Sequence, residues 1–259
     1  MKKVKIVRFK NGNLESAEDL ITEEYILHLK INPEVSFDVI ITPELIKEFV
    51  YGNLYTEGFI RSKEEIKKYN EKIKDNLINV TVQIKDFSRR LDFLKKNYNI
   101  VWTECGSVPE IKRLTDQIKS IEGKIKINAQ NVLNILDEIK DKIELFKQTG
   151  ALHYAFLFDY NTKLKIYSYD IGRHNAVDKV VGSQLLVDQR LDDKMLYITG
   201  RISLDIILKC LRVKIPIIIS RGAPLDSAVT IAQKYNICLI GFLRGKRFNI
   251  YSHPEVIVQ

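Results

Sequence analysis

Short apolar segments alternate with helical segments through the second half of this chain. The expected strands are Leu152–Phe158, Lys163–Tyr169, Lys194–Ile198, Ile215–Ile219, Ile237–Leu243 and Phe248–Tyr251. The expected helices are Asn175–Leu186, Ser203–Val213 and Asp226–Tyr235. Apolar strands that alternate with helices form a sheet covered by helices on both faces. The second half therefore predicts an α/β domain.

The first hundred residues have a mixed pattern, which predicts a smaller α+β domain. The expected strands are Val4–Phe9, Glu24–Ile31, Val35–Pro43 and Val80–Ile84, and the expected helices are Glu44–Tyr55 and Lys63–Tyr69. Phe87–Tyr98 is amphipathic and ambiguous. Asn128–Gln148 is the clearest helix of the chain, because its apolar residues recur at helical spacing. We place the N-terminal domain at residues 1–104 and the α/β domain at residues 105–259.

Composition narrows the classes of partner and the compartment. The formal net charge of +8 favours anionic partners, although a chain rich in solvated lysines has the same charge. The start of the chain has no signal-peptide core, and no apolar run approaches the roughly 18 residues that span a bilayer. Three scattered cysteines are too few for a disulfide framework, so we expect a reducing cytoplasm.

Four expected strands end in turns that combine a glycine with arginine. The turns are Gly172-Arg173-His174, Gly200-Arg201, Arg221-Gly222 and Arg244-Gly245-Lys246-Arg247. Ligands of open α/β sheets bind at the carboxyl ends of strands, where helix N-termini and arginines bind phosphate. A single arginine of this kind is more often a solvated surface charge, but four such turns together predict a site for a phosphorylated ligand.

The segment DIGRHNAVDK, from Asp170 to Lys179, is the densest of these turns. It combines Gly, Arg, His, Asn, Asp and Lys in ten positions between a strand and a helix. That density of donors and charges favours an anionic ligand over a core. Two roles for His174 stay open at this point: it hydrogen-bonds the ligand, or it caps structure within its own turn.

Stretches along most of the chain resemble the formate dehydrogenase accessory sulfurtransferase family (FdhD), in the family's order. They are TPELIKEFVYGNLYTEGFI (Thr42–Ile60), TECG (Thr103–Gly106), TGALHYAFLF (Thr149–Phe158), DIGRHNAVDKVVG (Asp170–Gly182), TGRISLDIILKC (Thr199–Cys210), IPIIISRGAP (Ile215–Pro224) and LIGFLRGKRFNIY (Leu239–Tyr251). GRHNAVDK is the most specific of them. The resemblance implies a cytidine-deaminase-like three-layer sandwich with a smaller N-terminal domain, and a homodimer.

The resemblance also implies a function. The family carries sulfur as a cysteine persulfide from a cysteine desulfurase to the molybdenum or tungsten bis-pterin guanine dinucleotide cofactor. The cofactor needs that sulfur before it enters formate dehydrogenase. The implied partners are therefore the desulfurase and formate dehydrogenase, and the cofactor is the cargo.

Cys105 is the persulfide carrier that the resemblance implies. Sulfur transfer needs a thiolate that attacks the donor's persulfide, and the Gly- and Pro-containing loop after Cys105 leaves the thiol free to visit donor and acceptor. The family pattern is Cys-Gly-x-Cys, but Val108 stands at the second cysteine here. This departure leaves open whether the protein transfers sulfur or mainly escorts the cofactor. Cys210 and Cys238 lie in apolar segments, so we expect them in the core.

The last of the four turns is the segment that contacts the cofactor in the family. Its residues here are Phe242, Leu243, Arg244, Gly245, Lys246 and Arg247. Three cations around a glycine suit the phosphates of a guanine dinucleotide, and the alternative is a basic hairpin turn. We expect Arg173, His174, Arg201 and Arg221 to line the same face.

Two rival classes are disfavoured. Zinc deaminases use an H-x-E motif with a P-C-x-x-C motif, whereas His153-Tyr154-Ala155 lacks the glutamate and the chain has no cysteine pair. We therefore expect no zinc, and we expect His153 to face the cofactor side or the core. Nucleic acid is disfavoured as a partner because the cations lie at strand ends and no nucleic-acid-binding motif is present.

Overall fold

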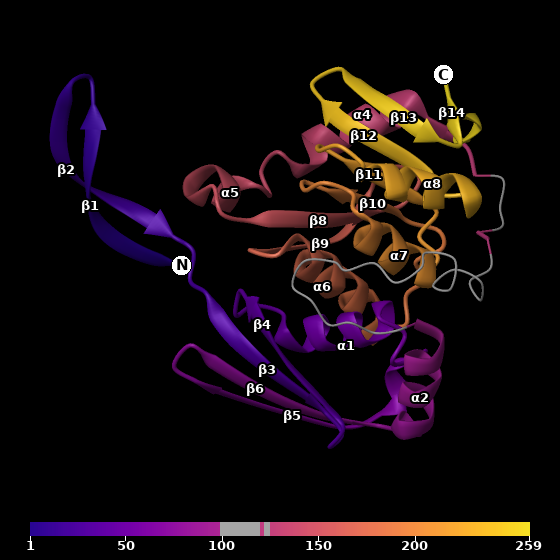
Figure 1. The fold of residues 1–259 in the computed structure, drawn as a ribbon. Helices are drawn as coiled ribbons and strands as arrows, with labels where there is room; N and C mark the ends of the chain where they lie inside the picture. Colours follow the sequence, from indigo (N-terminus) through magenta and orange to yellow (C-terminus); the bar gives the residue numbers. More distant parts are fainter. Residues whose placement is uncertain (99–119, 122–124) are drawn as a thin grey trace.

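The computed structural model describes residues 1–98, 120–121 and 125–259 (Figure 1). Its largest sheet has six strands in the order β13-β12-β11-β10-β8-β9. The strands are β8 (His153–Phe158), β9 (Leu164–Asp170), β10 (Met195–Ile198), β11 (Ile217–Ser220), β12 (Cys238–Arg244) and β13 (Arg247–Ser252). All six expected strands are present, so this part of the sequence prediction is confirmed.

Helices cover both faces of this sheet and form three layers. One face packs against α6 (Arg173–Leu186), α7 (Leu204–Arg212) and α8 (Asp226–Lys234), and the other packs against α4 (Ala129–Ile139). The mixed α/β architecture is confirmed, while the likeness to cytidine deaminases stays a prediction. Within the described residues, no helix is long and apolar enough to cross a membrane.

The expected helix Asn128–Gln148 is two helices, α4 and α5 (Glu144–Thr149). The Lys142 N–H donates to the Ile139 carbonyl 2.9 Å away, so a tight turn replaces the regular helical hydrogen bonds. The apolar residues keep a helical spacing across the turn between α4 and α5, because both helices pack apolar side chains against the same core. Gly150 ends α5 with φ of 66°, as expected of a C-terminal glycine.

The N-terminal half forms a four-stranded sheet in the order β4-β3-β6-β5. Its strands are β3 (Tyr25–Ile31), β4 (Val35–Ile41), β5 (Ile66–Lys74) and β6 (Leu77–Ile84). One face packs against α1 (Ile46–Thr56) and the start of α2 (Phe87–Tyr98) in a hydrophobic core of its own. The predicted domain boundary at residues 104 and 105 lies outside the described residues and stays a prediction.

One local prediction for the N-terminal half is wrong, and one strand was missed. Lys63–Tyr69 is not one helix: only η1 (Lys63–Glu65) is helical, and β5 begins at Ile66. Pairing with β6 outweighs the charged, helix-favouring composition of β5. The strand β2 (Asn13–Ile21) was not expected, although it forms a hairpin with β1 (Lys2–Lys10).

Helices α1 and α6 join the two halves of the molecule at unusually close range. A Cβ on Gly52 would lie 1.8 Å from the Asp178 carbonyl oxygen, and a Cβ on Gly182 would lie 1.8 Å from the Glu48 carbonyl oxygen. The two helix backbones are therefore in direct contact, and a side chain at either glycine would prevent that contact. Figure 1 shows α1 and α6 side by side between the N-terminal sheet and the larger sheet.

Candidate functional site

The four glycine–arginine turns meet at one edge of the six-stranded sheet. Strands β10, β11 and β12 are parallel, and β8 runs antiparallel to both β10 and β9. The carboxyl ends of β9, β10, β11 and β12 therefore lie at the same edge, together with the amino end of β8. The prediction that these turns share an edge is confirmed, and we call this edge the strand-end face.

Three helices begin at the strand-end face. The N-cap residues of α6, α7 and α8 are Gly172, Ser203 and Leu225, and none of them caps its helix with a side-chain hydrogen bond. The first backbone N–H groups of these helices and the positive ends of their dipoles are thus directed at this face. That arrangement favours an anion.

Arg173 and His153 lie over Gly200 in the middle of the strand-end face. A Cβ on Gly200 would lie 3.3 Å from Arg173 Cβ and Cδ and 3.3 Å from His153 Nδ1. A side chain at Gly200 would therefore crowd both groups. Among the described residues, the buried Nε of Arg173 has no hydrogen-bond partner. The fold of the described residues therefore leaves this donor unused.

His174 contacts the neighbouring turn. Its Nε2 lies 3.5 Å from Ser203 Oγ and 3.9 Å from Asp205 Oδ2, so it does not cap its own turn, and that alternative is wrong. Burial, together with the positive charges of Arg173 and Lys209, lowers the pKa of His174 to about 3. Burial and Arg173 also lower the pKa of His153. Both imidazoles are neutral at pH 7.

The turns after β11 and β12 are tied to each other. Arg244 Nε donates to the Arg221 carbonyl at 3.0 Å, and the Phe242 N–H donates to the Gly222 carbonyl at 3.0 Å. The Arg244 guanidinium lies 5.5 Å from the centroid of the Phe242 ring. Phe242 itself has φ of 54°, a left-handed conformation that a bulky side chain rarely adopts. The predicted cofactor segment is thus held in a defined conformation by the adjacent turn.

Exposed cations dominate this end of the face. Its exposed basic residues are Arg201, Arg221, Arg244, Lys246 and Arg247. Within the described part of the chain, none of them has a carboxylate partner. Burial raises the pKa of Tyr197 to about 12, and the nearby charges of Arg221 and Arg244 oppose that rise. Arg201 and Arg221 precede α7 and α8, whereas Arg244, Lys246 and Arg247 form the hairpin turn between β12 and β13. Cations without carboxylate partners beside open helix N-termini fit a phosphorylated ligand.

Leu243 differs from the other residues of the predicted cofactor segment. Its side chain is completely buried in the core beneath α4. The whole residue has no exposed surface, whereas Phe242 is half-buried and Gly245 is exposed with φ of 54°.

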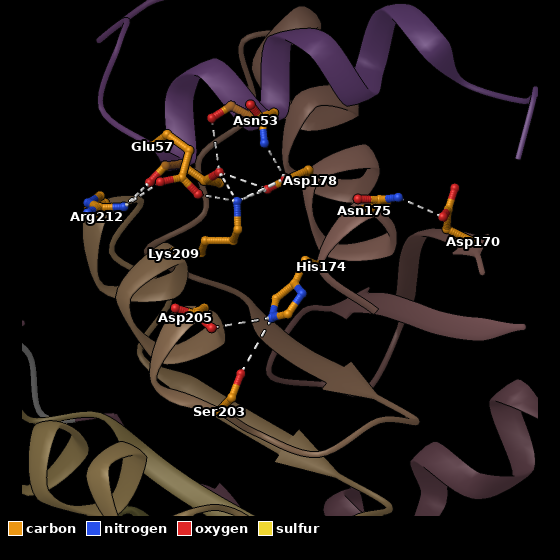
Figure 2. A network of polar contacts seen from close by, with 11 residues as sticks. Asn53, Glu57, Asp170, His174, Asn175, Asp178, Ser203, Asp205, Lys209 and Arg212 are labelled. Atoms are coloured by element: carbon orange, nitrogen blue, oxygen red, sulfur yellow. Dashed lines mark hydrogen bonds and ion pairs between the residues drawn. The ribbon is translucent and has the colours of Figure 1, made fainter. Parts of the chain in front are cut away.

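Most of the DIGRHNAVDK segment faces the N-terminal half, not the strand-end face. Lys179 Nζ lies 2.7 Å from Asp170 Oδ2, both side chains are fully buried, and the same ammonium donates to Thr42 Oγ1 at 2.7 Å. Asn175 Nδ2 donates to Asp170 Oδ1 at 2.9 Å (Figure 2). The interpretation of the whole segment as an anion site is therefore wrong. Within this segment, only Arg173 and His174 are placed at the strand-end face.

Asp178 belongs to a second buried network, which joins α1, α6 and α7 (Figure 2). Lys209 Nζ lies 2.9 Å from Asp178 Oδ2 and 2.7 Å from Glu57 Oε1. Burial raises the pKa of Asp178, whereas Lys209 and Arg212 outweigh burial at Glu57 and lower its pKa to about 2. The sequence analysis missed this network. Its signal was a lysine within the apolar run IILKCL, because a charge in such a run needs a buried partner.

The three cysteines separate into two groups. Cys210 and Cys238 are buried in the two cores of the larger sheet, as expected. Burial raises the pKa of both thiols, to about 12 for Cys238, so neither is a ready thiolate. Cys105 lies outside the described residues, as does Val108. The described residues hold no group of three or more His, Cys, Asp or Glu side chains arranged for a metal ion.

Comparison with known proteins connects these features to a family. A sequence model described as the FdhD/NarQ family matches residues 22–258. The chain is 34% identical over its whole length to the sulfur carrier protein FdhD of Bacillus pumilus, covering 98% of that protein. It is 32% identical to the sulfur carrier protein FdhD of Bacillus subtilis, covering 96% of this chain and 95% of that protein.

A solved structure has the same fold. It is a crystal structure of a protein named as a formate dehydrogenase accessory protein from Desulfotalea psychrophila. It superimposes with a TM-score of 0.77 at 26% identity and covers 99% of each chain. The similarity therefore includes the N-terminal half and the strand-end face together.

Proposed function

Because the chain belongs to the FdhD/NarQ family, we propose that it is a cytoplasmic sulfur carrier that matures formate dehydrogenase. In this proposal it takes sulfur from a cysteine desulfurase and passes it to the molybdenum or tungsten bis-pterin guanine dinucleotide cofactor. The observation that carries the proposal is the full-length similarity to proteins named sulfur carrier protein FdhD. The strand-end face supports the proposal, because its exposed cations and the open N-termini of α6, α7 and α8 favour an anionic ligand.

The proposed chemistry begins at Cys105. Its thiolate attacks the terminal sulfur of the persulfide on the desulfurase, a new S–S bond forms on Cys105, and the desulfurase cysteine leaves as a thiolate. Exchange of this kind is neutral in electrons and needs no external oxidant. One thiol suffices for it, so Val108 in place of a second cysteine does not prevent loading.

The proposed cargo site is the strand-end face. The guanine dinucleotide portions of the cofactor carry phosphates, which match the exposed cations of the turns after β10, β11 and β12 and the open N-termini of α6, α7 and α8. The unpartnered Nε of Arg173 and the neutral imidazole of His174 add donors beside them. A guanine nucleotide diphosphate is the simplest probe of this site.

The test of sulfur transfer is intact-protein mass spectrometry. The protein is incubated with a cysteine desulfurase and L-cysteine, and we expect a mass increase of one sulfur atom that peptide mapping assigns to Cys105. Cys105→Ser is the matched control and stays unmodified, because Cys210 and Cys238 are buried.

An unmodified Cys105, under conditions that load another sulfur carrier, would contradict sulfur transfer. Retained binding of the guanine nucleotide in that same preparation would then favour the alternative function, a chaperone that escorts the cofactor without adding sulfur. This alternative is considered because Val108 replaces the family's second cysteine.

A further inference from the structure

Asp205 carries an exposed carboxylate on a face that is dominated by exposed cations. It is the second residue of α7, which begins at the strand-end face, and its side chain is 47% exposed. The carboxylates of Glu57 and Asp178, in the neighbouring buried network, are both paired with the ammonium of Lys209. Asp205 differs from them, because no lysine or arginine of the described residues lies within ion-pair distance of its oxygens.

The position of Asp205 is defined by its contact with His174. Asp205 Oδ2 lies 3.9 Å from His174 Nε2, which is too long for a hydrogen bond (Figure 2). The imidazole is neutral, because burial and nearby cations lower its pKa to about 3. His174 belongs to the first turn of α6, next to Arg173. The Asp205 carboxylate therefore lies between the N-termini of α6 and α7, and both of its oxygens are free to accept hydrogen bonds from a ligand.

A carboxylate in the first turn of a helix also has an ordinary structural role, because it interacts favourably with the helix dipole. Asp226 is placed in the same way at the start of α8, whereas α6 has no acid in its first turn. This role does not make the carboxylate neutral towards a ligand. A negative charge at the start of α7 opposes a phosphate there. The phosphates of a ligand are thus directed to α6 and to the basic turns, and the start of α7 suits a part of the ligand that donates hydrogen bonds.

The chemistry of a carboxylate determines which donors fit. It only accepts hydrogen bonds, and two adjacent donors satisfy both of its oxygens. Guanine presents such a pair, the N1–H and the 2-amino group. A pterin ring presents the same pair, because it contains the same 2-amino-4-oxopyrimidine unit. Each half of the proposed cofactor thus carries this donor edge on two rings, whereas it has a single ribose.

We propose that Asp205 is a specificity-determining residue of the strand-end face, whose carboxylate accepts the paired N–H and amino donors of a guanine or pterin ring. This inference rests on the proposed cargo site and adds a division of labour within it. The exposed cations bind the phosphates, and Asp205 binds the donor edge of the ring. A base without that pair of donors leaves the carboxylate unpaired, so the face should discriminate against it.

Calorimetric titration of the full-length protein tests the guanine source. If the carboxylate binds guanine, wild type should bind guanosine diphosphate (GDP) at least about tenfold more tightly than inosine diphosphate, which lacks only the 2-amino group. Asp205→Asn should remove that difference. The variant should also bind xanthosine diphosphate more tightly than GDP, because the asparagine amide donates to the carbonyl oxygen that replaces the amino group. Partial unfolding cannot produce such a reversal of preference.

Titration with free pterin (2-amino-4-oxopteridine) tests the second source. If the carboxylate binds the pterin ring, Asp205→Asn should weaken pterin binding at least about tenfold and leave the affinities for GDP and inosine diphosphate unchanged. Asp226→Asn is the matched control, because it removes the first-turn carboxylate of α8. It should change the affinities for the two nucleotides by the same factor and leave pterin binding unchanged.

Three results would overturn the inference. The first is equal affinity of wild type for GDP and inosine diphosphate, together with pterin binding that is absent or unaffected by Asp205→Asn; the proposed cargo site would then stand without this specificity. The second is that Asp205→Asn and Asp226→Asn alter binding alike, as the helix-dipole role alone predicts. The third is that wild type binds neither GDP nor pterin, which would overturn the cargo site as well. Sulfur loading of Cys105 is measured separately by mass spectrometry and does not depend on any of these results.

Discussion

Replacing Lys209 with methionine tests how far the buried network between α1, α6 and α7 holds the two halves together. Methionine keeps the apolar stem and removes the charge. Asp178, whose side chain is 1% exposed, then loses the ammonium 2.9 Å from its Oδ2. Glu57 loses the same partner at 2.7 Å. The variant therefore leaves a buried carboxylate without its cation.

The structure sets the expected magnitude. Removing one partner of a buried ion pair costs about 3–5 kcal/mol. Asp178 keeps hydrogen bonds from Asn53 Nδ2 at 3.0 Å and Thr56 Oγ1 at 2.7 Å, which offset part of that cost. We expect Lys209→Met to lower the free energy of unfolding by about 3 kcal/mol at pH 7. Lys209→Met combined with Asp178→Asn should lose only about 1 kcal/mol, because no unpaired charge remains.

The assay is urea unfolding followed by circular dichroism, with the free energy of unfolding extrapolated to water. Lys72→Met on the exposed β5 is the matched control and should stay within about 0.5 kcal/mol of wild type. The deficit of Lys209→Met should shrink as pH falls, since burial already raises the pKa of Asp178 and protonation removes its unpaired charge. A loss below about 1 kcal/mol, or a double variant less stable than the single one, would refute the reasoning.

Three other changes test the site and the contact between the halves. Arg244→Ala with Arg247→Ala should weaken binding of a guanine nucleotide diphosphate at least about tenfold by calorimetry, and unchanged affinity would move the site elsewhere. Gly52→Ala should lower the melting temperature sharply, because its Cβ would lie 1.8 Å from a backbone oxygen; an unchanged melting temperature would contradict the close packing. The pKa of Glu57 in the folded protein is lowered to about 2, so its carboxylate contributes stability above pH 4.5 that the wild type loses as pH falls towards 2. Glu57→Gln should remove that contribution, and an unaltered acid-unfolding profile would contradict this.

The central strands of the larger sheet were predictable from the sequence because they are buried on both faces. β10 and β11 read as short apolar runs between helices, and only one arrangement buries such runs. β5 was not predictable, because it is an edge strand with mostly exposed, charged side chains and its conformation depends on pairing with β6. β2 was predictable in principle from Asn11-Gly12, a strong short-range hairpin signal.

The strand-end face was predictable as a location, because glycine and arginine follow each parallel strand at its carboxyl end. The partners of its individual charges were not. Arg173 and Lys179 lie six positions apart in one segment, yet Lys179 is fully buried against the Asp170 carboxylate and Arg173 lies beside Gly200. Sequence spacing gives the helix face of each residue but not which neighbouring element covers that face. Which face of α6 is covered depends on its close contact with α1, and the sequence spacing does not contain that contact.

This division of one ten-residue segment leads to opposite expectations for two of its cations. Arg173→Ala removes a guanidinium whose Nε has no partner in the described structure, so we expect little change in melting temperature and a loss of guanine nucleotide binding. Lys179→Met leaves Asp170 buried without its ammonium, so we expect a large loss of stability, as in other broken buried pairs. Thermal unfolding and nucleotide titration on both variants separate the effects, with Lys179→Met titrated well below its melting temperature. If Arg173→Ala destabilised the protein as much as Lys179→Met, the guanidinium would be part of the fold. The assignment of Arg173 to the ligand would then fail.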